Sequence, residues 1–349
     1  MTAPTPSPTY QLFVGVDIAA ATFTAAWTAP DRVLSTPRTF DQSPAGFAAF
    51  QQQLQATGVP PAATLVVLEA TGSYWVALAV TLHTAGFVVS VLNPAQAHYF
   101  AKSQLRRAKS DTLDTQVLTQ FALERQPPAW TPPPAVYHEL RQRLLMRESL
   151  VDMRQQARNQ RHALRQWPVV VAGVQQQLDE LIADLSRRIE ALEREIASVV
   201  QAGEWAASAS YLQSIPGIGV LTAAWLLVTT LNFTLCESAE AATAYAGLAP
   251  QVHESGTSVK GRRRIGHTGN GHLRTALYMA TMSAAQHNPA IKPFYSRLRA
   301  AGKPIKVARC AAARKLLHLA FAVVTKQQLF DPSYQKLPSP VLNEMASAT

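Results

Sequence analysis

LFVGVDI, at Leu12–Ile18, is an apolar run rich in β-branched residues, a pattern typical of a buried strand. It carries a single acidic residue, Asp17, near its end. A second run of the same kind, TLVVLE at Thr64–Glu69, ends in a carboxylate as well. Beyond these runs, we expect further strands at Thr22–Thr28, near Arg32–Thr36 and at Phe87–Leu92, and helices at 44–57, at Tyr74–Ala85 and after Pro94. Strands that alternate with helices predict an α/β domain around a central sheet.

This α/β domain is expected to cover residues 11–126, after a disordered leader at 1–10. Gln126–Pro134 then holds five prolines in nine residues, so helix cannot run through it and we place a domain boundary there.

Residues 136–200 have helical composition, with an interruption near Trp167–Gly173. In the second half, apolar residues recur in alternating steps of four and three, the seam of a coiled coil: Leu178, Ile182, Leu185, Ile189, Leu192, Ile196 and Val199. A Pro-rich linker with coiled-coil helices is therefore predicted over 127–203. Charged residues beside the seam favour a partner helix, from a second protomer, and packing onto the chain's own domain is the alternative.

Residues 204–330 are expected to form an all-α domain, followed by a loosely ordered tail at 331–349. Near its start, Ile215-Pro216-Gly217-Ile218-Gly219 resembles the hairpin of a helix-hairpin-helix element. Gly217 and Gly219 would let the backbone approach a phosphate, and the next helix would offer its free N–H groups. An ordinary tight turn is the alternative.

The charge is strongly uneven along the chain. The sequence has 32 Lys and Arg against 22 Asp and Glu, a formal net charge of +10, which favours a polyanionic partner such as nucleic acid. From Ser255 to Phe330 it contains no acidic residue, whereas the cations are many: Lys260, Arg262, Arg263, Arg264, Arg274, Lys292, Arg297, Arg299, Lys303, Lys306, Arg309, Arg314, Lys315 and Lys326. A stretch of one sign suits a phosphate backbone.

Other classes of protein are excluded by composition. Two cysteines, Cys236 and Cys310, are too few for a disulfide framework or a cysteine-based zinc site, and we expect both to be buried thiols. No apolar run is long enough to span a bilayer and the first residues do not resemble a signal peptide, so a cytoplasmic location is expected.

Four carboxylates stand out by their positions. Asp17 and Glu69 end predicted strands, and Asp111 and Asp114 form a D-x-x-D pair. Carboxylates that converge from separate elements make a hard-oxygen site for Mg²⁺ or Mn²⁺, which could act at phosphorus. Taken singly, each residue could instead cap a turn, start a helix or face solvent. The cations just before the pair suit a phosphodiester substrate or a bound RNA: Lys102, Arg106, Arg107 and Lys109.

The loop GLAPQVHESGTSVKGRRRIGHTGNG, at Gly247–Gly271, is rich in Gly, Ser and Thr. Ser255 is a candidate nucleophile or phosphate contact, with Thr257 and Ser258 as competitors and a solvated turn serine as the alternative. No GxSxG elbow or Ser-His-Asp arrangement accompanies it. The nearby cations are candidates for nucleic-acid binding: Lys260, Arg262, Arg263, Arg264 and Arg274.

Taken together, these segments resemble the DEDD transposases of the IS110 family of insertion sequences. The resemblance lies in GVDIAAATF, VVLEATGSYW, KSDTLDTQVL, IPGIGVLTAAWL, AYAGLAPQVHESGTS and RRRIGHTGNGHLRTALYMAT, and runs from about Phe13 to Lys326. One departure is Ala where the first motif of the family often has Lys, in Asp17-Ile18-Ala19-Ala20-Ala21, which removes one possible phosphate contact.

The resemblance implies an RNase H-like (RuvC-like) α/β domain, a coiled-coil connector and an all-α transposase domain. It implies that Asp17, Glu69, Asp111 and Asp114 bind Mg²⁺ or Mn²⁺, and that Ser255, or else Ser258, attacks DNA to form a phosphoserine linkage. The implied partners are donor and target DNA, a guide (bridge) RNA, and further copies of the chain as a dimer that assembles into a tetramer. Active sites would then join the acidic domain of one protomer to the serine domain of another, in a bacterial cytoplasm near the nucleoid.

Two other functions remain open from the sequence. One is a metal-dependent, structure-specific DNA endonuclease, resembling a junction resolvase, in which water is the nucleophile and Ser255 is structural. The other is a nucleic-acid-binding protein without catalytic activity.

Overall fold

The computed structural model describes residues 10–30, 32–70, 72–104, 111–251, 254–255, 259–260, 264–265 and 269–333. For 111–113, 250–251, 254–255, 259–260 and 264 it describes the backbone alone. The chain divides into two compact units, an N-terminal unit at Met1–Pro132 and a C-terminal unit at Pro133–Thr349, which are treated separately below.

The N-terminal unit is built on a five-stranded sheet in the order β3-β2-β1-β4-β5. Its strands are β1 (Leu12–Ile18), β2 (Thr22–Thr28), β3 (Arg38–Asp41), β4 (Thr64–Glu69) and β5 (Val88–Leu92). β1, β2 and β3 pair antiparallel, whereas β1, β4 and β5 pair parallel. The expected α/β domain with a central sheet is confirmed.

The third strand lies later in the chain than the sequence predicted. At residues 32–36 the chain contacts β2 at Ser35, whose N–H donates to the Trp27 carbonyl (2.9 Å) and whose Oγ accepts from the Trp27 N–H (3.0 Å). The regular ladder starts only after Pro37, at Arg38, which pairs with Ala25. Pro37 has no N–H to donate to a ladder, which explains the later start.

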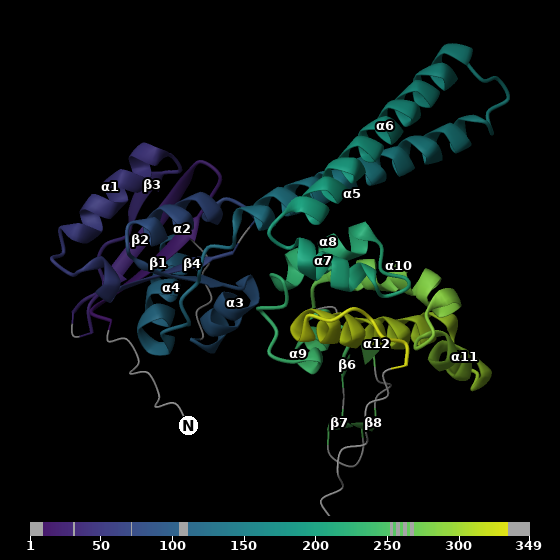
Figure 1. The fold of residues 1–349 in the computed structure, drawn as a ribbon. Helices are drawn as coiled ribbons and strands as arrows, with labels where there is room; N and C mark the ends of the chain where they lie inside the picture. Colours follow the sequence, from purple (N-terminus) through teal and green to yellow (C-terminus); the bar gives the residue numbers. More distant parts are fainter. Residues whose placement is uncertain are drawn as a thin grey trace, which may run out of the picture. The chain divides into compact units, whose positions relative to one another are not determined.

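Alternating side chains give the sheet two apolar faces. One face packs against α1 (Pro44–Gln55) and α2 (Trp75–Thr84), and the other against α3 (Pro94–Ser103) and α4 (Asp111–Arg125) (Figure 1). The first core contains Val14, Val16, Phe23, Phe50, Val66, Leu68 and Leu82, and the second contains Phe13, Leu65, Val67, Leu92, Leu118 and Ala122. A short 3₁₀ turn, Pro61–Ala63, leads into β4.

The Pro-rich segment crosses the surface of this unit as an ordered strap. The N–H of Trp130 donates to the Val89 carbonyl on β5 (2.6 Å), and its ring packs edge-on against Trp75, with 5.6 Å between ring centroids. The prolines therefore lead the chain along the sheet edge without helix, as their lack of backbone donors requires.

The C-terminal unit begins with a long helical hairpin of α5 (Ala135–Leu164) and α6 (Ala172–Ala202), which lie side by side in Figure 1. The seam of α6 faces α5, and its buried members are Ile182, Leu185, Ile189 and Ile196, followed by Val200. Ion pairs join the two helices beside the seam, Arg147–Glu193 at 2.7 Å and Arg143–Glu195 at 3.1 Å. The predicted pair of long helices therefore forms, but the expectation of a partner helix from a second protomer is wrong for the buried part of the seam, because α5 of the same chain covers it.

The rest of this unit is helical, which confirms the expected helical C-terminal part. It contains α7 (Ala206–Gln213), α8 (Val220–Thr230), α9 (Ala239–Tyr245), α10 (Gly271–His287), α11 (Lys292–Ala300) and α12 (Ile305–Lys326). Two strand pairs of two residues each lie between α9 and α10: β6 (Pro250–Gln251) with β9 (Arg264–Ile265), and β7 (Glu254–Ser255) with β8 (Val259–Lys260).

A single apolar core holds these helices together. Its fully buried members include Leu212, Leu227, Leu277, Leu316 and Leu317, and it reaches Leu140, Leu144 and Ile196 of the hairpin. Cys236 is buried and Cys310 is half-buried, both as free thiols, and burial raises the pKa of each. None of the helices described is long and apolar enough to cross a membrane.

Candidate functional site

Helix α4 lies unusually close to strand β1 at Gly15. A Cβ atom at this position would lie 2.3 Å from the Thr119 nitrogen and 2.6 Å from the Thr115 carbonyl oxygen, both backbone atoms of α4. The Gly15 N–H also donates to Thr119 Oγ1 (3.2 Å), and that hydroxyl donates to the Ala26 carbonyl of β2 (3.0 Å). A residue without a side chain at 15 therefore lets the helix rest directly on the strand backbone.

The direction of α4 follows from these contacts. Thr115, one turn before Thr119, places its Oγ1 3.5 Å from the Thr24 carbonyl, and Thr24 pairs with Asp17. Going back along α4 from Thr119 to Thr115 thus means going forward along β1 from Gly15 to Asp17. The helix runs antiparallel to β1, and its first turn, with Asp111 and Asp114, lies at the carboxyl end of that strand.

Asp17 and Glu69 lie at the same edge of the sheet and on the same face. β1 and β4 are parallel neighbours, and the register pairs Val16 with Leu68, so the next residues, Asp17 and Glu69, are level. Val16 and Leu68 point into the core under α1 and α2. Since successive side chains alternate, both carboxylates belong to the opposite face, the one that α4 covers.

The side chains of Asp17, Glu69 and Asp114 are half-buried, and both Asp17 and Glu69 have polar or electrostatic interactions. Asp111 is the first residue of α4, but its side chain lies outside the described part. Among the side chains that the structure describes, no group of three or more His, Cys, Asp or Glu is placed to hold a metal ion. Carboxylate oxygens from two strands and one helix have the chemistry that Mg²⁺ and Mn²⁺ prefer.

Of the cations predicted beside these carboxylates, Lys102 is exposed in the last turn of α3. Arg106, Arg107 and Lys109 lie outside the described residues.

The candidate serine lies in the C-terminal unit. Ser255 is the second residue of β7 and pairs with Val259 of β8, so that residues 256–258 join the two strands. Thr257 and Ser258, the competing candidates, lie outside the described residues, as do Arg262 and Arg263. Lys260 ends β8 and pairs with Glu254, and Arg264 begins β9, both described by backbone alone.

Helix α10 follows this loop and is firmly anchored. Asn270 caps it by accepting from the Leu273 N–H (3.0 Å). The Arg274 guanidinium, predicted to bind nucleic acid, donates to the Ala246 carbonyl at the end of α9 (3.2 Å). At least part of its donor capacity is therefore used within the protein.

The two glycines of the turn at 215–219 have different surroundings. Gly217 has φ +104°, and a Cβ there would lie 2.6 Å from Cβ of Ala284 on α10. Gly219 is exposed at the N-cap of α8, with nothing within 4 Å of a Cβ. Asn288 also donates to the Pro216 carbonyl (3.0 Å). The turn therefore packs on α10 through Gly217 and leaves Gly219 open to solvent.

Sequence reasoning missed one polar contact close to the start of α10. His272 Nδ1 lies 2.8 Å from a carboxylate oxygen of Glu148 on α5, and its ring stacks on Trp225 of α8 at 4.6 Å between centroids, with 4° between the planes. The three residues come from three helices far apart in the sequence, so no local pattern could have joined them. The contact joins the helical hairpin to α10, the helix that follows the segment containing Ser255.

Comparisons with known proteins match both units. A family model for DEDD transposases, described as Transposase, covers residues 14–166, and one described as Transposase IS116/IS110/IS902 family covers residues 209–296. The pilin gene-inverting protein of Moraxella bovis is 32% identical over 321 residues, 91% of this chain and 97% of that protein, and the same values hold for its counterpart in Moraxella lacunata. An uncharacterized 43.6 kDa protein of insertion element IS110 from Streptomyces coelicolor is 34% identical over 169 residues, 46% of this chain and 40% of that protein.

Proposed function

This chain belongs to the IS110 family of transposases, and from that premise we propose that it cuts and rejoins donor and target DNA through a covalent serine intermediate. The Moraxella relatives are named for inverting a pilin gene. Inversion and transposition both require that broken DNA ends be rejoined to new partners, which a covalent intermediate achieves without an external energy source.

In this proposal the N-terminal unit is an RNase H-like (RuvC-like) catalytic domain. The strand order β3-β2-β1-β4-β5, antiparallel on one side of β1 and parallel on the other, supports it. The observation that carries the proposal is the level position of Asp17 and Glu69 on the face covered by α4, where that helix begins. Together with Asp111 and Asp114 they would hold Mg²⁺ or Mn²⁺. When bound, such an ion offsets charge that develops on the scissile phosphate.

The role of Ser255 is that of nucleophile, with Ser258 as the second candidate. Its Oγ forms a bond to phosphorus while the bond from phosphorus to one deoxyribose oxygen breaks, and the serine proton passes to that leaving oxygen. The resulting phosphoserine diester keeps the energy of the bond that was cut. Attack by a hydroxyl of a second DNA end then reverses the same exchange and frees the serine.

In the same proposal, a bridge RNA selects the DNA sites. The active protein is a dimer that assembles into a tetramer, with active sites composed of residues from two protomers. The cations near both sets of catalytic residues support contact with phosphates: Lys102, Arg106, Arg107 and Lys109 before the D-x-x-D pair, and Lys260, Arg262, Arg263, Arg264 and Arg274 around Ser255. Gly219, exposed at the start of α8, would offer a backbone approach in the manner of a helix-hairpin-helix.

The test is to trap the intermediate. End-labelled DNA that carries the ends of the element is incubated with the protein, Mg²⁺ and RNA that co-purifies with it, and the products are denatured and resolved by size. Wild-type protein and Ser258→Ala should yield a protein–DNA adduct, and Ser255→Ala should yield none. Asp17→Asn should bind DNA without forming the adduct.

Three outcomes would count against parts of the proposal. Normal cutting by Ser255→Ala without an adduct would favour water as the nucleophile and a metal-dependent endonuclease. An adduct that disappears only in Ser258→Ala would move the nucleophile to that residue. Co-purified RNA unrelated to the DNA that flanks the gene would remove the guide and leave the recombination chemistry intact.

A further inference from the structure

Helix α11, the turn after it and the first turn of α12 carry cations that the proposed chemistry does not use. We call this cluster the basic turn and define it by five exposed residues: Lys292, Arg297, Arg299, Lys303 and Lys306. The chain has no Asp or Glu between Ser255 and Phe330, so neither helix supplies a carboxylate beside it. None of the ion pairs found in the described part of the chain involves these residues.

The basic turn is well ordered by its backbone. Gly302, just past the end of α11, has φ +75°; the Lys303 N–H donates to the Leu298 carbonyl (3.1 Å) and the Gly302 N–H donates to the Arg299 carbonyl (3.0 Å). This is the pattern of a Schellman cap, which reverses the chain within a few residues. The cations on the turn are therefore presented from a fixed scaffold at little cost in backbone entropy.

Contacts within the protein hold two arginines of the basic turn: Arg297 lies 5.5 Å from the ring centre of Phe294, and Arg299 donates to the Lys303 carbonyl. Two neighbouring cations join helices to one another. Arg309 lies 5.7 Å from the ring centre of Tyr278, across α12 and α10. Lys315 lies 5.1 Å from the ring centre of Phe294 on α11, and its ammonium group donates to the Ala290 carbonyl (2.9 Å). Burial, and then the nearby Arg297, lower the pKa of Lys315. Arg309 and Lys315 thus join helices to one another, whereas the lysines of the basic turn extend into solvent.

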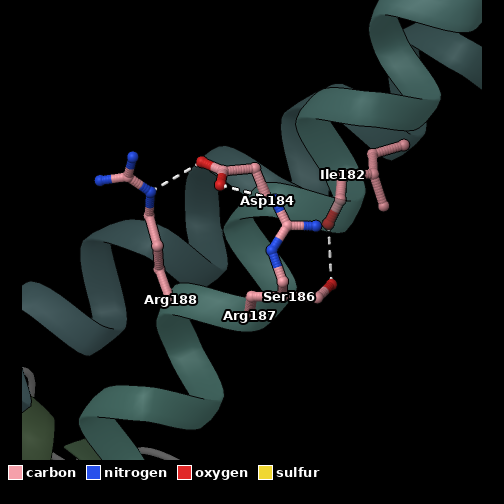
Figure 2. Close-up of polar contacts among 5 residues, drawn as sticks. All are labelled: Ile182, Asp184, Ser186, Arg187 and Arg188. Carbon is pink, nitrogen blue, oxygen red and sulfur yellow. Dashed lines mark hydrogen bonds and ion pairs between the residues drawn. The ribbon is translucent and has the colours of Figure 1, made fainter.

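On the helical hairpin, by contrast, Arg187 and Arg188 pair with a carboxylate of the same helix. Figure 2 shows Arg187 and Arg188 directed at the same carboxylate, Asp184, at 2.9 and 2.7 Å. The hydrogen bond from Arg188 and the charge of both arginines lower the pKa of Asp184. Ser186 turns away and donates to the Ile182 carbonyl (2.8 Å). Arg187 and Arg188 thus share the charge of one carboxylate, whereas Lys292, Lys303 and Lys306 form no ion pair with a carboxylate among the described residues.

We propose that the basic turn binds the phosphate backbone of duplex DNA, without reading its sequence. The inference rests on the proposed function for the identity of the polyanion and adds a surface to it. Lysine ammonium groups on a fixed turn suit point contacts to phosphates, which position a duplex and carry no base information. The side chains of Ile305 and Val307 are 48% and 52% exposed beside these cations, and they give the turn an apolar edge that can lie against sugars.

The test compares two variants that lose the same charge. Lys303→Gln/Lys306→Gln removes two exposed cations of the basic turn, and Arg187→Gln/Arg188→Gln removes two cations of the hairpin that pair with Asp184. Binding of the full-length proteins to a fluorescent 30-base-pair DNA of arbitrary sequence is measured by anisotropy at several salt concentrations. Each lost phosphate contact lowers the slope of log K against log[salt] by about 0.9, so the basic-turn variant should lose about 1.8. At 0.1 M salt this corresponds to roughly 60-fold weaker binding.

The hairpin variant should keep the wild-type slope of log K against log[salt]. Lys303→Arg/Lys306→Arg, which keeps both charges, should keep it as well. The proposal is overturned if the basic-turn variant keeps the wild-type slope and affinity, if both variants lose the same amount, or if the loss appears with a duplex or single-stranded RNA but not with DNA. Unfolding curves identify a variant that has lost its fold, and in that case the Lys→Arg pair decides whether charge at these positions is needed. If the basic-turn variant has a lower slope but the wild-type protein never forms a serine–DNA adduct, the DNA-binding role of the basic turn stands and the proposed serine chemistry is wrong.

Discussion

Gly15→Ala is the substitution through which the packing of the N-terminal unit can be tested most directly. The new methyl group would lie 2.3 Å from the Thr119 nitrogen, 2.6 Å from the Thr115 oxygen and 2.7 Å from the Leu118 carbonyl carbon. All three are backbone atoms, so no side chain can rotate out of the way. Since ordinary contact begins near 3.4 Å, α4 must withdraw from β1 by about 1 Å.

Two consequences differ in size. Overpacking of this kind costs about 1–3 kcal/mol of unfolding free energy, which leaves a folded protein. The withdrawal also shifts Asp111 and Asp114 relative to Asp17, and a misplacement of about 1 Å at a reacting centre can cost roughly 100-fold in rate. We therefore expect a moderate loss of stability and a much larger loss of Mg²⁺-dependent DNA breakage.

The measurement combines urea unfolding with the rate of strand breakage at saturating DNA and Mg²⁺. Gly173→Ala in the first turn of α6 is the matched control, because nothing lies within 4 Å of its Cβ. It should leave the rate unchanged and stabilise by about 0.4–1 kcal/mol, since the unfolded chain loses freedom. Wild-type stability and rate in Gly15→Ala would refute the close contact. Loss of stability with a normal rate would separate α4 from the catalytic site.

Two further predictions concern the C-terminal unit. Gly217→Ala should lower the unfolding free energy by roughly 2–4 kcal/mol, because the methyl group would meet Ala284 at 2.6 Å and because φ is +104°. Gly219→Ala is the control in the same unfolding experiment and should cost less than about 1 kcal/mol. The pKa of His138 is lowered from 6.5 by burial and then by Arg141, so the unfolded chain takes up this proton more readily than the folded one. Stability should thus fall as the pH drops below about 6.5 and level off below the folded pKa; a His138→Gln variant with an unchanged pH profile from 5 to 8 would contradict this.

How much of the molecule could be predicted depends on the range of the interactions. The buried strands were predictable because each is a continuous apolar run, and the parallel pairing of β1 with β4 then brings Asp17 and Glu69 level. By contrast, nothing in the sequence near Gly15 announces that a helix a hundred residues later will rest on it. β3 was placed too early because residues 32–36 look extended, whereas the ladder depends on which N–H groups face β2.

The heptad seam illustrates a second limit. Spacing reveals that α6 has an apolar stripe, and it cannot reveal which helix covers the stripe. In the structure α5 of the same chain covers Ile182, Leu185, Ile189 and Ile196. A dimer formed through this hairpin must therefore use other surfaces, and the far end offers a hollow of about 480 Å³ lined by Leu164, Trp167, Val174, Leu178 and Leu181, among others.

The charge of the chain shows the same limit. A net charge of +10 predicts a polyanionic partner but does not say where that partner binds. Local pairing decides this, because an arginine already held by a carboxylate releases little on meeting a phosphate, whereas an unpaired lysine exchanges only counterions and water. Arg147, Arg161 and Arg188 of the hairpin are of the first kind. Lys303 and Lys306, which form no ion pair within the part of the chain that the structure describes, are of the second. The affinity of this protein for DNA should therefore depend on these two lysines far more than their share of the total charge would suggest.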